Sequence, residues 1–232
     1  MRKIIRNSAE CFQCGDKLES KSVHDFKSCS CGNISVDGGK EYIRRLGDIE
    51  HKNSQDTSVT EVILQCTILS GPSGAGKSTF IKKEIYQESV VLSADHFFMV
   101  DGEYKFDPTK LSEAHNSCLR KFIAACQEGE AAKRLDKESP LVVVDNTNTT
   151  VEEIAPYYSV AKAFGYEVEL VTLHTPVELA TKRNVHGVPF KSVQAMQDRI
   201  AARKLPPFWN LKQTNLRWTN SLYGNIGRFE RA

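Results

Sequence analysis

The chain has 232 residues, of which 40% are hydrophobic and 26% are charged, so it can form one α/β domain with a core of its own and a smaller module. It contains no run of about 18 apolar residues, which excludes a transmembrane helix from the expected elements. Residues 1–8 are basic but lack an apolar stretch, so we expect no secretory signal and a reducing, cytoplasmic location.

Charge is distributed unevenly along the chain. The net charge is +2, but residues 180–232 hold ten lysines and arginines against two acidic residues. A basic C-terminal part suits phosphate-rich ligands such as ATP or nucleic acid. A solvated basic face is the alternative explanation.

Cysteines are concentrated near the N-terminus, where four of the seven lie in two close pairs. The four are Cys11, Cys14, Cys29 and Cys31. Their thiolates can hold one tetrahedral Zn²⁺, and a segment as short as residues 1–47 can hardly build a sufficient core without such a staple. His24 is a possible substitute ligand because the second pair is C-x-C, and disulfides are the rival explanation. We predict a four-cysteine, zinc-ribbon-like module over residues 1–47 that holds structural zinc.

The next segment, residues 48–60, is polar and lacks periodicity, which predicts a linker. From residue 61 to residue 205, apolar strand-like segments alternate with segments of helical spacing. The predicted strands are residues 62–69, 89–93, 141–145 and 167–174. The predicted helices are residues 79–86, 108–128, 151–164, 176–184 and 190–203. This alternation is typical of the α/β class, with a parallel sheet flanked by helices.

Local signals predict further details of this domain. Asp101-Gly102 is a hairpin turn signal, and Thr175 before Pro176 predicts an N-capped helix start. Three cysteines in predicted strands or helices are expected to be buried small hydrophobic residues: Cys66, Cys118 and Cys126. Residues 206–232 show no clear pattern, and we predict a basic aromatic extension. Its aromatic side chains include Phe208, Trp209 and Trp218.

The residues Gly71–Thr79 read GPSGAGKST and satisfy the pattern G-x-x-x-x-G-K-[ST]. The glycines let backbone amides curl around an anion, and a helix that starts near them points its positive end at phosphates. Lys77 would reach the β- and γ-phosphates of ATP, and the Ser78 hydroxyl would bind Mg²⁺. The predicted ATP-binding residues are Gly71, Ser73, Gly74, Ala75, Gly76, Lys77, Ser78 and Thr79. A chance glycine-rich turn is disfavoured by the strand before it and the helix after it. The fold is therefore predicted to be a P-loop NTPase or kinase fold.

Two aspartates follow predicted strands at the sheet edge where α/β proteins bind ligands. Asp95 can accept a proton from an attacking hydroxyl, although capping of the next turn is an equal alternative. Asp145 ends an apolar run and can hold Mg²⁺ through water or orient the acceptor. Asn148 lies in the polar stretch after it, where helix capping is the alternative role. Arg183, near a helix end, can stabilise phosphate charge during transfer.

Four motifs in this order and spacing resemble the P-loop polynucleotide 5′-hydroxyl kinases. They are GPSGAGKST, LSADHFF, VVVDNTNTT and KRNVHGVP, and the similarity covers about residues 61–204. The family includes the kinase module of the phage kinase–phosphatase and its eukaryotic relatives. The resemblance implies that Lys77 and Ser78 bind ATP·Mg²⁺, that Asp95 is the general base, and that Arg183 is a lid arginine.

The resemblance also implies that Asp145 lies on the acceptor side, and we expect Asn148 and His186 to contact the substrate there as well. Two positions depart from the family pattern. Phe98 stands where the phage enzyme has an arginine that helps to hold the substrate phosphate, and His186 stands in place of a second lid arginine. No phosphatase signature D-x-D-x-[TV] occurs, so we predict a kinase without 3′-phosphatase activity.

These observations predict phosphoryl transfer from ATP to the 5′-hydroxyl of a DNA or RNA end. The basic C-terminal part and the aromatic residues listed above would grip the strand by charge and stacking. A small-molecule kinase on the same scaffold is the first alternative. A nucleotide-dependent binding or adaptor protein without acceptor turnover is the second, because a fold alone does not determine function.

Overall fold

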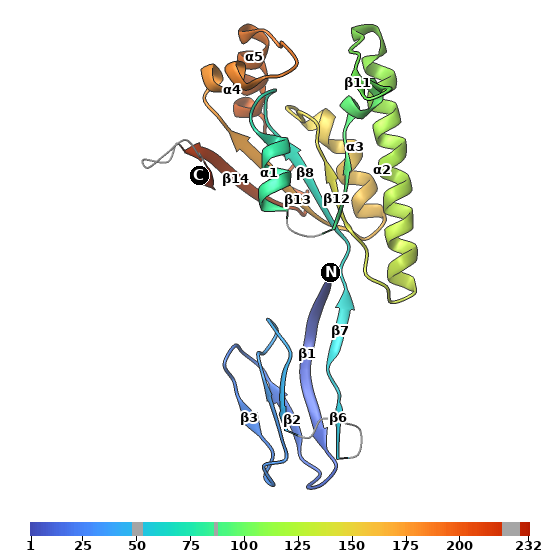
Figure 1. Cartoon of the computed structure of the whole chain (residues 1–232), viewed down its shortest axis with the longest axis vertical. Coiled ribbons are helices and arrows are strands. Elements are labelled where there is room, and N and C mark those ends of the chain that lie inside the picture. The colour runs from blue at the N-terminus through green and yellow to red at the C-terminus, as the bar shows by residue number, and fades with distance from the viewer. Residues whose placement is uncertain (48–52, 86–87, 220–227) are drawn as a thin grey trace. The chain divides into compact units, whose positions relative to one another are not determined.

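A computed structural model of the chain describes residues 1–47, 53–85, 88–219 and 228–232 (Figure 1). It divides into two compact units. The first comprises residues 1–63 and 136–138, and the second comprises residues 64–135 and 139–232. No helix in these described ranges has both the length and the apolar character needed to cross a membrane.

The N-terminal unit consists of short antiparallel strands around one long strand, β1 (Arg2–Cys11). The others are β2 (Lys17–Ser20), β3 (Lys27–Ser28), β4 (Ile34–Asp37), β5 (Arg44–Gly47), β6 (Ser54–Asp56) and β7 (Val59–Val62). Strands β2, β6 and β7 pair with β1, while β3, β4 and β5 form a second sheet. The small core includes Ile34, Val36 and two of the clustered cysteines.

The segment predicted as a linker takes part in this unit. Within its described part, β6 and β7 pair with β1, so residues 54–60 do not form a free connection. Arg45 also binds the segment, because its guanidinium donates to Asp56 Oδ1 at 3.1 Å and Ser58 Oγ at 2.6 Å. Edge strands that face solvent carry no apolar alternation, and the sequence pattern therefore missed them.

The second unit is built on a six-stranded sheet in the order β15-β14-β13-β8-β12-β9. The strands are β8 (Gln65–Ser70), β9 (Ser89–Leu92), β12 (Leu141–Val144), β13 (Glu167–His174), β14 (Lys212–Thr219) and β15 (Arg228–Arg231). All neighbouring pairs are parallel except β14 with β15. The expected parallel sheet flanked by helices is thus confirmed.

Helices cover both faces of this sheet (Figure 1). They are α1 (Lys77–Glu84), α2 (Leu111–Arg134), α3 (Val151–Ala163), α4 (Val177–Arg183) and α5 (Phe190–Ala202). Alternate residues of β12 show the two faces: Val142 belongs to the core cluster under α2 and α3, and Val143 belongs to the cluster under α1. The short helices η1 (Ala94–Phe98) and η2 (Pro108–Lys110) precede α2.

Several local predictions can be compared with the structure. Asp101 and Gly102 have φ angles of 55° and 81° and join β10 (Met99–Val100) to β11 (Glu103–Tyr104), as the hairpin signal predicted. The cysteines at 66, 118 and 126 are buried as expected. The prediction for Thr175 was wrong, because α4 has no side-chain cap and Thr175 Oγ1 donates instead to the Ala75 carbonyl at 2.9 Å.

Two parts of the predicted C-terminal extension, residues 212–219 and 228–231, are strands of the sheet. Strand β14 continues the parallel sheet beside β13, and β15 returns along it. The half-buried residues of β14 alternate at Thr214, Leu216 and Trp218, which is the period of a strand with one packed face. Only two of these half-buried residues, Leu216 and Trp218, are apolar, so the alternation is too short to be recognised in the sequence.

Candidate active site at the P-loop

The P-loop joins β8 to α1 and forms an open anion cradle. Gly74 and Gly76 have φ angles of +77° and +97°, a region that residues with a Cβ rarely adopt. Helix α1 begins at Lys77 with neither a side-chain cap nor an acidic residue in its first turn. Its first backbone amides are therefore available to an anion such as a phosphate.

Gly74 lies against the helix that carries Arg183. A Cβ built on Gly74 would stand 1.9 Å from the carbonyl oxygen of Ala180 in α4. The absence of a side chain at Gly74 therefore allows α4 to pack directly against the loop, and this contact fixes the distance between the loop and Arg183.

We expect Gly74→Ala to abolish measurable ATP binding, because the new methyl group must push α4 and the P-loop apart. Gly165→Ala is the matched control, since Gly165 also has a positive φ (+75°) but open space around its Cβ position. The control should lose about 1 kcal/mol of stability from backbone strain alone and keep its ATP affinity. Calorimetric titration with ATP checks both variants, and equal affinities would disprove the packing argument.

Lys77 lies inside the loop and is held by its backbone. Its Nζ donates to the carbonyl oxygens of Gly71 and Pro72 at 3.1 and 3.2 Å. Burial lowers the pKa of Lys77, and the nearby carboxylates of Asp145 and Asp95 partly oppose this effect. A desolvated ammonium group beside open backbone amides is a suitable partner for phosphate oxygens.

Ser78 and Asp145 supply oxygen ligands of the kind that Mg²⁺ prefers. Ser78 Oγ donates to Asp145 Oδ2 at 3.3 Å, so both oxygens face the same space. Burial raises the pKa of the Asp145 carboxyl, while Lys77 and the Ser78 hydrogen bond lower it. A divalent cation bound here would offset the cost of burying this carboxylate, so the donor set fits Mg²⁺.

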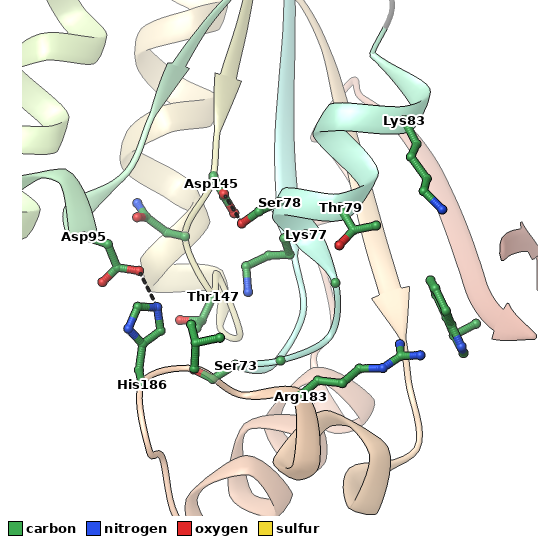
Figure 2. A pocket seen from close by; sticks show the side chains of 15 residues that line it. Ser73, Lys77, Ser78, Thr79, Lys83, Asp95, Asp145, Thr147, Arg183 and His186 are labelled. Carbon is green, nitrogen blue, oxygen red and sulfur yellow. Dashed lines mark hydrogen bonds and ion pairs between the residues drawn. The ribbon is translucent and has the colours of Figure 1, made fainter. Parts of the chain in front are cut away.

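Asp95 lies in η1 and faces the P-loop from the other side of the same pocket (Figure 2). Two side chains hold its carboxylate: Tyr104 Oη donates to Oδ1 at 3.1 Å, and His186 Nε2 lies 3.8 Å from Oδ2. The Tyr104 and His186 rings also contact each other, with centroids 4.6 Å apart. Burial, followed by the charge and hydrogen bond of Asp95, raises the pKa of Tyr104 to about 12.

Sequence reasoning missed Tyr104. The available signal was the Asp101-Gly102 turn, because a two-residue hairpin pairs Met99 with Tyr104 and thereby folds Tyr104 back toward Asp95.

The loop after Asp145 is largely structural. Asn148 has a φ of 43°, its Nδ2 donates to the Leu69 carbonyl at 2.7 Å, and its side chain is buried. Arg203 donates to the Asn148 carbonyl at 2.7 Å and to Ser70 Oγ at 2.8 Å. The amide of Asn148, expected to contact substrate, therefore holds the loop against β8.

Asn146 connects the two walls of the site. Its Oδ1 accepts from the Ala94 amide at 2.9 Å, one residue before Asp95, and its Nδ2 donates to Tyr157 Oη in α3 at 3.1 Å. This buried amide fixes the backbone that carries Asp95. Thr150 caps α3 through the Glu153 amide, in agreement with the capping alternative.

One pocket of about 570 Å³ brings most of the predicted residues together (Figure 2). Those that line it are Ser73, Gly74, Gly76, Lys77, Ser78, Thr79, Asp95, Asp145, Arg183 and His186. Gly71, Ala75 and Asn148 do not line it. Five lining residues were not among the predicted site residues: Lys83, Asn146, Thr147, Val185 and Trp218.

A second cavity of about 370 Å³ shares Asn146 and Thr147 with the first. Its other lining residues come from α2, α3 and the loop before α3: His115, Asn116, Leu119, Asn148, Glu152, Glu153, Pro156 and Tyr157. The two cavities therefore lie next to each other.

The four N-terminal cysteines form a separate cluster. Their sulfur atoms all lie within 4.8 Å of one another, and Cys31 Sγ lies 3.7 Å from Cys11 Sγ and 3.5 Å from Cys29 Sγ. A tetrahedron of thiolates around zinc has edges of ~3.8 Å, whereas a disulfide has a length of ~2.05 Å. The backbone amide of Asp16, followed by Ser30, lowers the pKa of Cys14 to about 6, which favours the thiolate form. The cluster can therefore bind a metal such as Zn²⁺.

Comparison with known proteins gives two family matches. A family described as an AAA domain matches residues 67–204, and a domain family of unknown function, DUF7695, matches residues 3–47. Human NEDD4-binding protein 2 is 30% identical over 158 residues, which cover 61% of this chain and 8% of that protein. The chain thus spans less than a tenth of the length of this relative.

Two solved structures resemble the chain at low sequence identity. The AvrRxo1-ORF1:AvrRxo1-ORF2 complex with sulphate ions has a TM-score of 0.49 and 16% identity, covering 73% of this chain and 60% of the other. The Pnkp1/Rnl/Hen1 RNA repair complex has a TM-score of 0.44 and 16% identity, covering 61% and 45%. The family match, the sheet order and the P-loop together show that the second unit has an α/β P-loop kinase-like fold.

Proposed function

Since this chain belongs to the family of the AAA domain through its residues 67–204, we propose that it is an ATP-dependent kinase that phosphorylates the 5′-hydroxyl of DNA or RNA ends. The observation that carries this proposal is the arrangement of one pocket. Lys77, Ser78 and Asp145 lie on its phosphate side, and Asp95 faces them. A proton acceptor opposite a phosphate cradle is what transfer to a hydroxyl requires.

In the proposed reaction, the P-loop amides and Lys77 hold the triphosphate, and Ser78 with Asp145 holds Mg²⁺. The bound cation offsets phosphate charge during transfer. The acceptor oxygen forms a bond to the γ-phosphorus while the bond to the β,γ-bridging oxygen breaks, and ADP leaves. Asp95 takes the hydroxyl proton. Tyr104 and His186 fix the orientation of the Asp95 carboxylate during this step.

We propose that the second cavity holds the terminal nucleoside of the acceptor. It shares Asn146 and Thr147 with the pocket that Asp95 lines, and Tyr157 and Leu119 offer apolar surface to a sugar or base. Arg183 and His186 lie on the lid side of the pocket, where they would close over the transferring phosphate.

The experiment is incubation of the purified protein with γ-labelled ATP, Mg²⁺ and a panel of 5′-hydroxyl DNA and RNA oligonucleotides. We expect label on the oligonucleotide 5′ end and none with Lys77→Ala. ATP binding without label on any oligonucleotide would overturn the proposal in favour of another acceptor or a nucleotide-dependent binding protein.

A second candidate is a small-molecule kinase, and the lining of the acceptor cavity favours it. Among the residues that line this cavity in the described part of the chain, two are glutamates and none is lysine or arginine. Phe98, at the position of the family's phosphate-binding arginine, is 3% exposed and packs against Tyr104 and Phe106. Oligonucleotide binding that weakens with added salt would favour the polynucleotide acceptor. Protein cations that pair with phosphates release counterions from the nucleic acid, and added salt opposes this release.

We further propose that the cysteine cluster holds one structural Zn²⁺. The sulfur spacing and the buried positions of Cys11 and Cys29 support this assignment. We expect atomic emission to find one zinc per chain in the wild type and almost none in Cys14→Ser, with loss of protease resistance in residues 1–63. Cys126→Ala, which removes a thiol buried in the other unit, should retain zinc. A full zinc content in Cys14→Ser would contradict the assignment.

A further inference from the structure

Figure 2 shows Asp95 and Arg183 on opposite sides of the P-loop pocket, and an aromatic side chain lies against Arg183. This side chain is Trp218 of β14, which lines the pocket together with Thr79 and Lys83 of α1. The guanidinium carbon of Arg183 lies 4.0 Å from the centre of the Trp218 ring. This strand enters the site well after the lid arginine in the chain, and no motif in the sequence pointed to it.

We propose that Trp218 is the stacking platform for the nucleobase of the phosphoryl donor, and that β14 and β15 thereby complete a nucleoside triphosphate site. The inference rests on the proposed function, which places the γ-phosphate near Asp95. A triphosphate with its γ end at Asp95 and its other phosphates along the P-loop directs its nucleoside away from Asp95. Among the described residues that line the pocket, the aromatic ring next to Arg183 is the indole of Trp218.

The indole is held in place by packing. Its ring contacts the Phe229 ring edge to face at a centroid distance of 5.0 Å, and Phe229 contacts Phe80 of α1 at 6.0 Å. Phe229 also approaches the P-loop itself, because a Cβ built on Gly76 would lie 3.1 Å from its ring. These aromatic rings and the phosphate cradle are therefore one packed assembly, and stacking on a preorganised ring costs little entropy.

Arg183 shows that a planar group fits on the pocket side of the indole. A guanidinium is flat and stacks on aromatic faces much as a base does. A base that enters between Arg183 and Trp218 needs the arginine to move by about one stacking distance, ~3.5 Å. Arg183 then covers the other face of the base and stays next to the phosphates.

The register places Trp218 at the ligand-binding edge of the sheet. His174, the last residue of β13, pairs with Arg217, so Trp218 lies one residue beyond the end of this pairing. Ligands of parallel α/β sheets bind at this carboxyl edge.

The expectation that Trp218 and Trp209 grip a nucleic acid together does not follow from this arrangement. Trp209 stacks on Tyr158 of α3 at 4.4 Å, in the core cluster on the opposite face of the sheet from Phe229.

The chain contains two tryptophans, so fluorescence can test the assignment with a matched control. We expect MgATP to quench the emission of the wild type and of Trp209→Phe, and to leave Trp218→Phe without quenching. Calorimetry should show that Trp218→Leu weakens ATP binding by about 5- to 150-fold, the range for loss of one base–aromatic stack. Trp218→Leu should bind inorganic tripolyphosphate as well as the wild type does, since the phosphate cradle is intact.

Wild-type ATP affinity in Trp218→Leu would overturn the proposal, and so would an equal loss of ATP and tripolyphosphate affinity, which would indicate damage to the loop. The assay is independent of the acceptor. Failure of oligonucleotide phosphorylation with this binding pattern intact would reject the proposed function and support the donor site. Absence of ATP binding in the wild type would overturn both.

Discussion

Asp95→Asn is expected to lower kcat by about 10²- to 10⁴-fold, the range for loss of a positioned general base. Asparagine has the same size and still accepts the hydrogen bond from Tyr104, but it cannot take the acceptor proton. The P-loop and Lys77 are unchanged, so the Kd for ATP should stay within a few-fold of the wild-type value. The separation of kcat from Kd distinguishes a chemical role from a merely structural one.

Asp101→Asn is the matched control for this prediction. Asp101 lies six residues further along, at the hairpin turn, and asparagine tolerates its positive φ of 55°. Steady-state kinetics with the labelled substrate checks both variants. Turnover by Asp95→Asn within a few-fold of the wild type would show that another group accepts the proton.

The fold was predictable where local signals and packing agree. Strands β8 and β12 are buried on both faces. In the sequence, β12 is a continuous apolar run and β8 is part of a largely apolar segment. Helix α2 carries its buried residues on one face, among them Ala114, Cys118 and Phe122, and the spacing gave the helix although not its full length. The Asp101-Gly102 turn gave the hairpin because few other structures accept two consecutive positive φ values.

The features that sequence analysis missed depend on partners far away in the chain and show no apolar periodicity of their own. Strand β7 (Val59–Val62) is a polar edge strand whose pairing with β1 depends on residues more than 50 positions away. Strand β14 extends the sheet, but only Leu216 and Trp218 among its half-buried residues are apolar. Thr175 has a typical capping sequence, yet its hydroxyl is taken by the Ala75 carbonyl of the P-loop, a partner 100 positions away in the chain. Such tertiary partners cannot be read from local sequence.

The site residues also divide into those with a local sequence signal and those without one. Lys77 and Ser78 could be placed in advance, because a P-loop motif defines the phosphate side. The apolar strand that ends in Asp145 predicted only its place at the sheet edge. The resemblance assigned Asp145 to the acceptor side, whereas its carboxylate accepts a hydrogen bond from Ser78 Oγ at 3.3 Å.

Tyr104 and Trp218 were not placed in advance. The Asp101-Gly102 turn predicted the hairpin, but the contact of Tyr104 with Asp95 and the pairing of β14 with β13 are known only from the structure. A residue that acts by positioning another side chain can therefore be identified only from the three-dimensional structure, whereas a residue in a defined motif can be identified from the sequence.

Lys77→Met is expected to lower kcat by about 10²- to 10³-fold and also to raise the thermal stability of the protein without nucleotide. The loss of activity follows from removal of a preorganised positive charge at the transferring phosphate. The gain in stability follows from the lowered pKa of Lys77 in the folded state, whose main cause is burial. Because the pKa of Lys77 is lower in the folded chain than in the unfolded chain, its amine binds a proton less tightly after folding. At a pH below the folded-state pKa the amine is charged in both states, and its charge then destabilises the folded state. Methionine has a similar shape and no charge to desolvate.

Lys82→Met is the matched control, because Lys82 is exposed on the same helix and does not line the pocket. It should change neither kcat nor the melting temperature appreciably. Melting curves with and without MgATP separate the two effects: Lys77→Met should melt above the wild type without nucleotide and gain less from its addition. A lower melting temperature for Lys77→Met without nucleotide would show that the ammonium stabilises the empty loop through the Gly71 and Pro72 carbonyls. In that case Lys77 would be a structural clamp as well as a phosphate ligand, and the stability gained from ATP would have to come from the backbone amides of the P-loop.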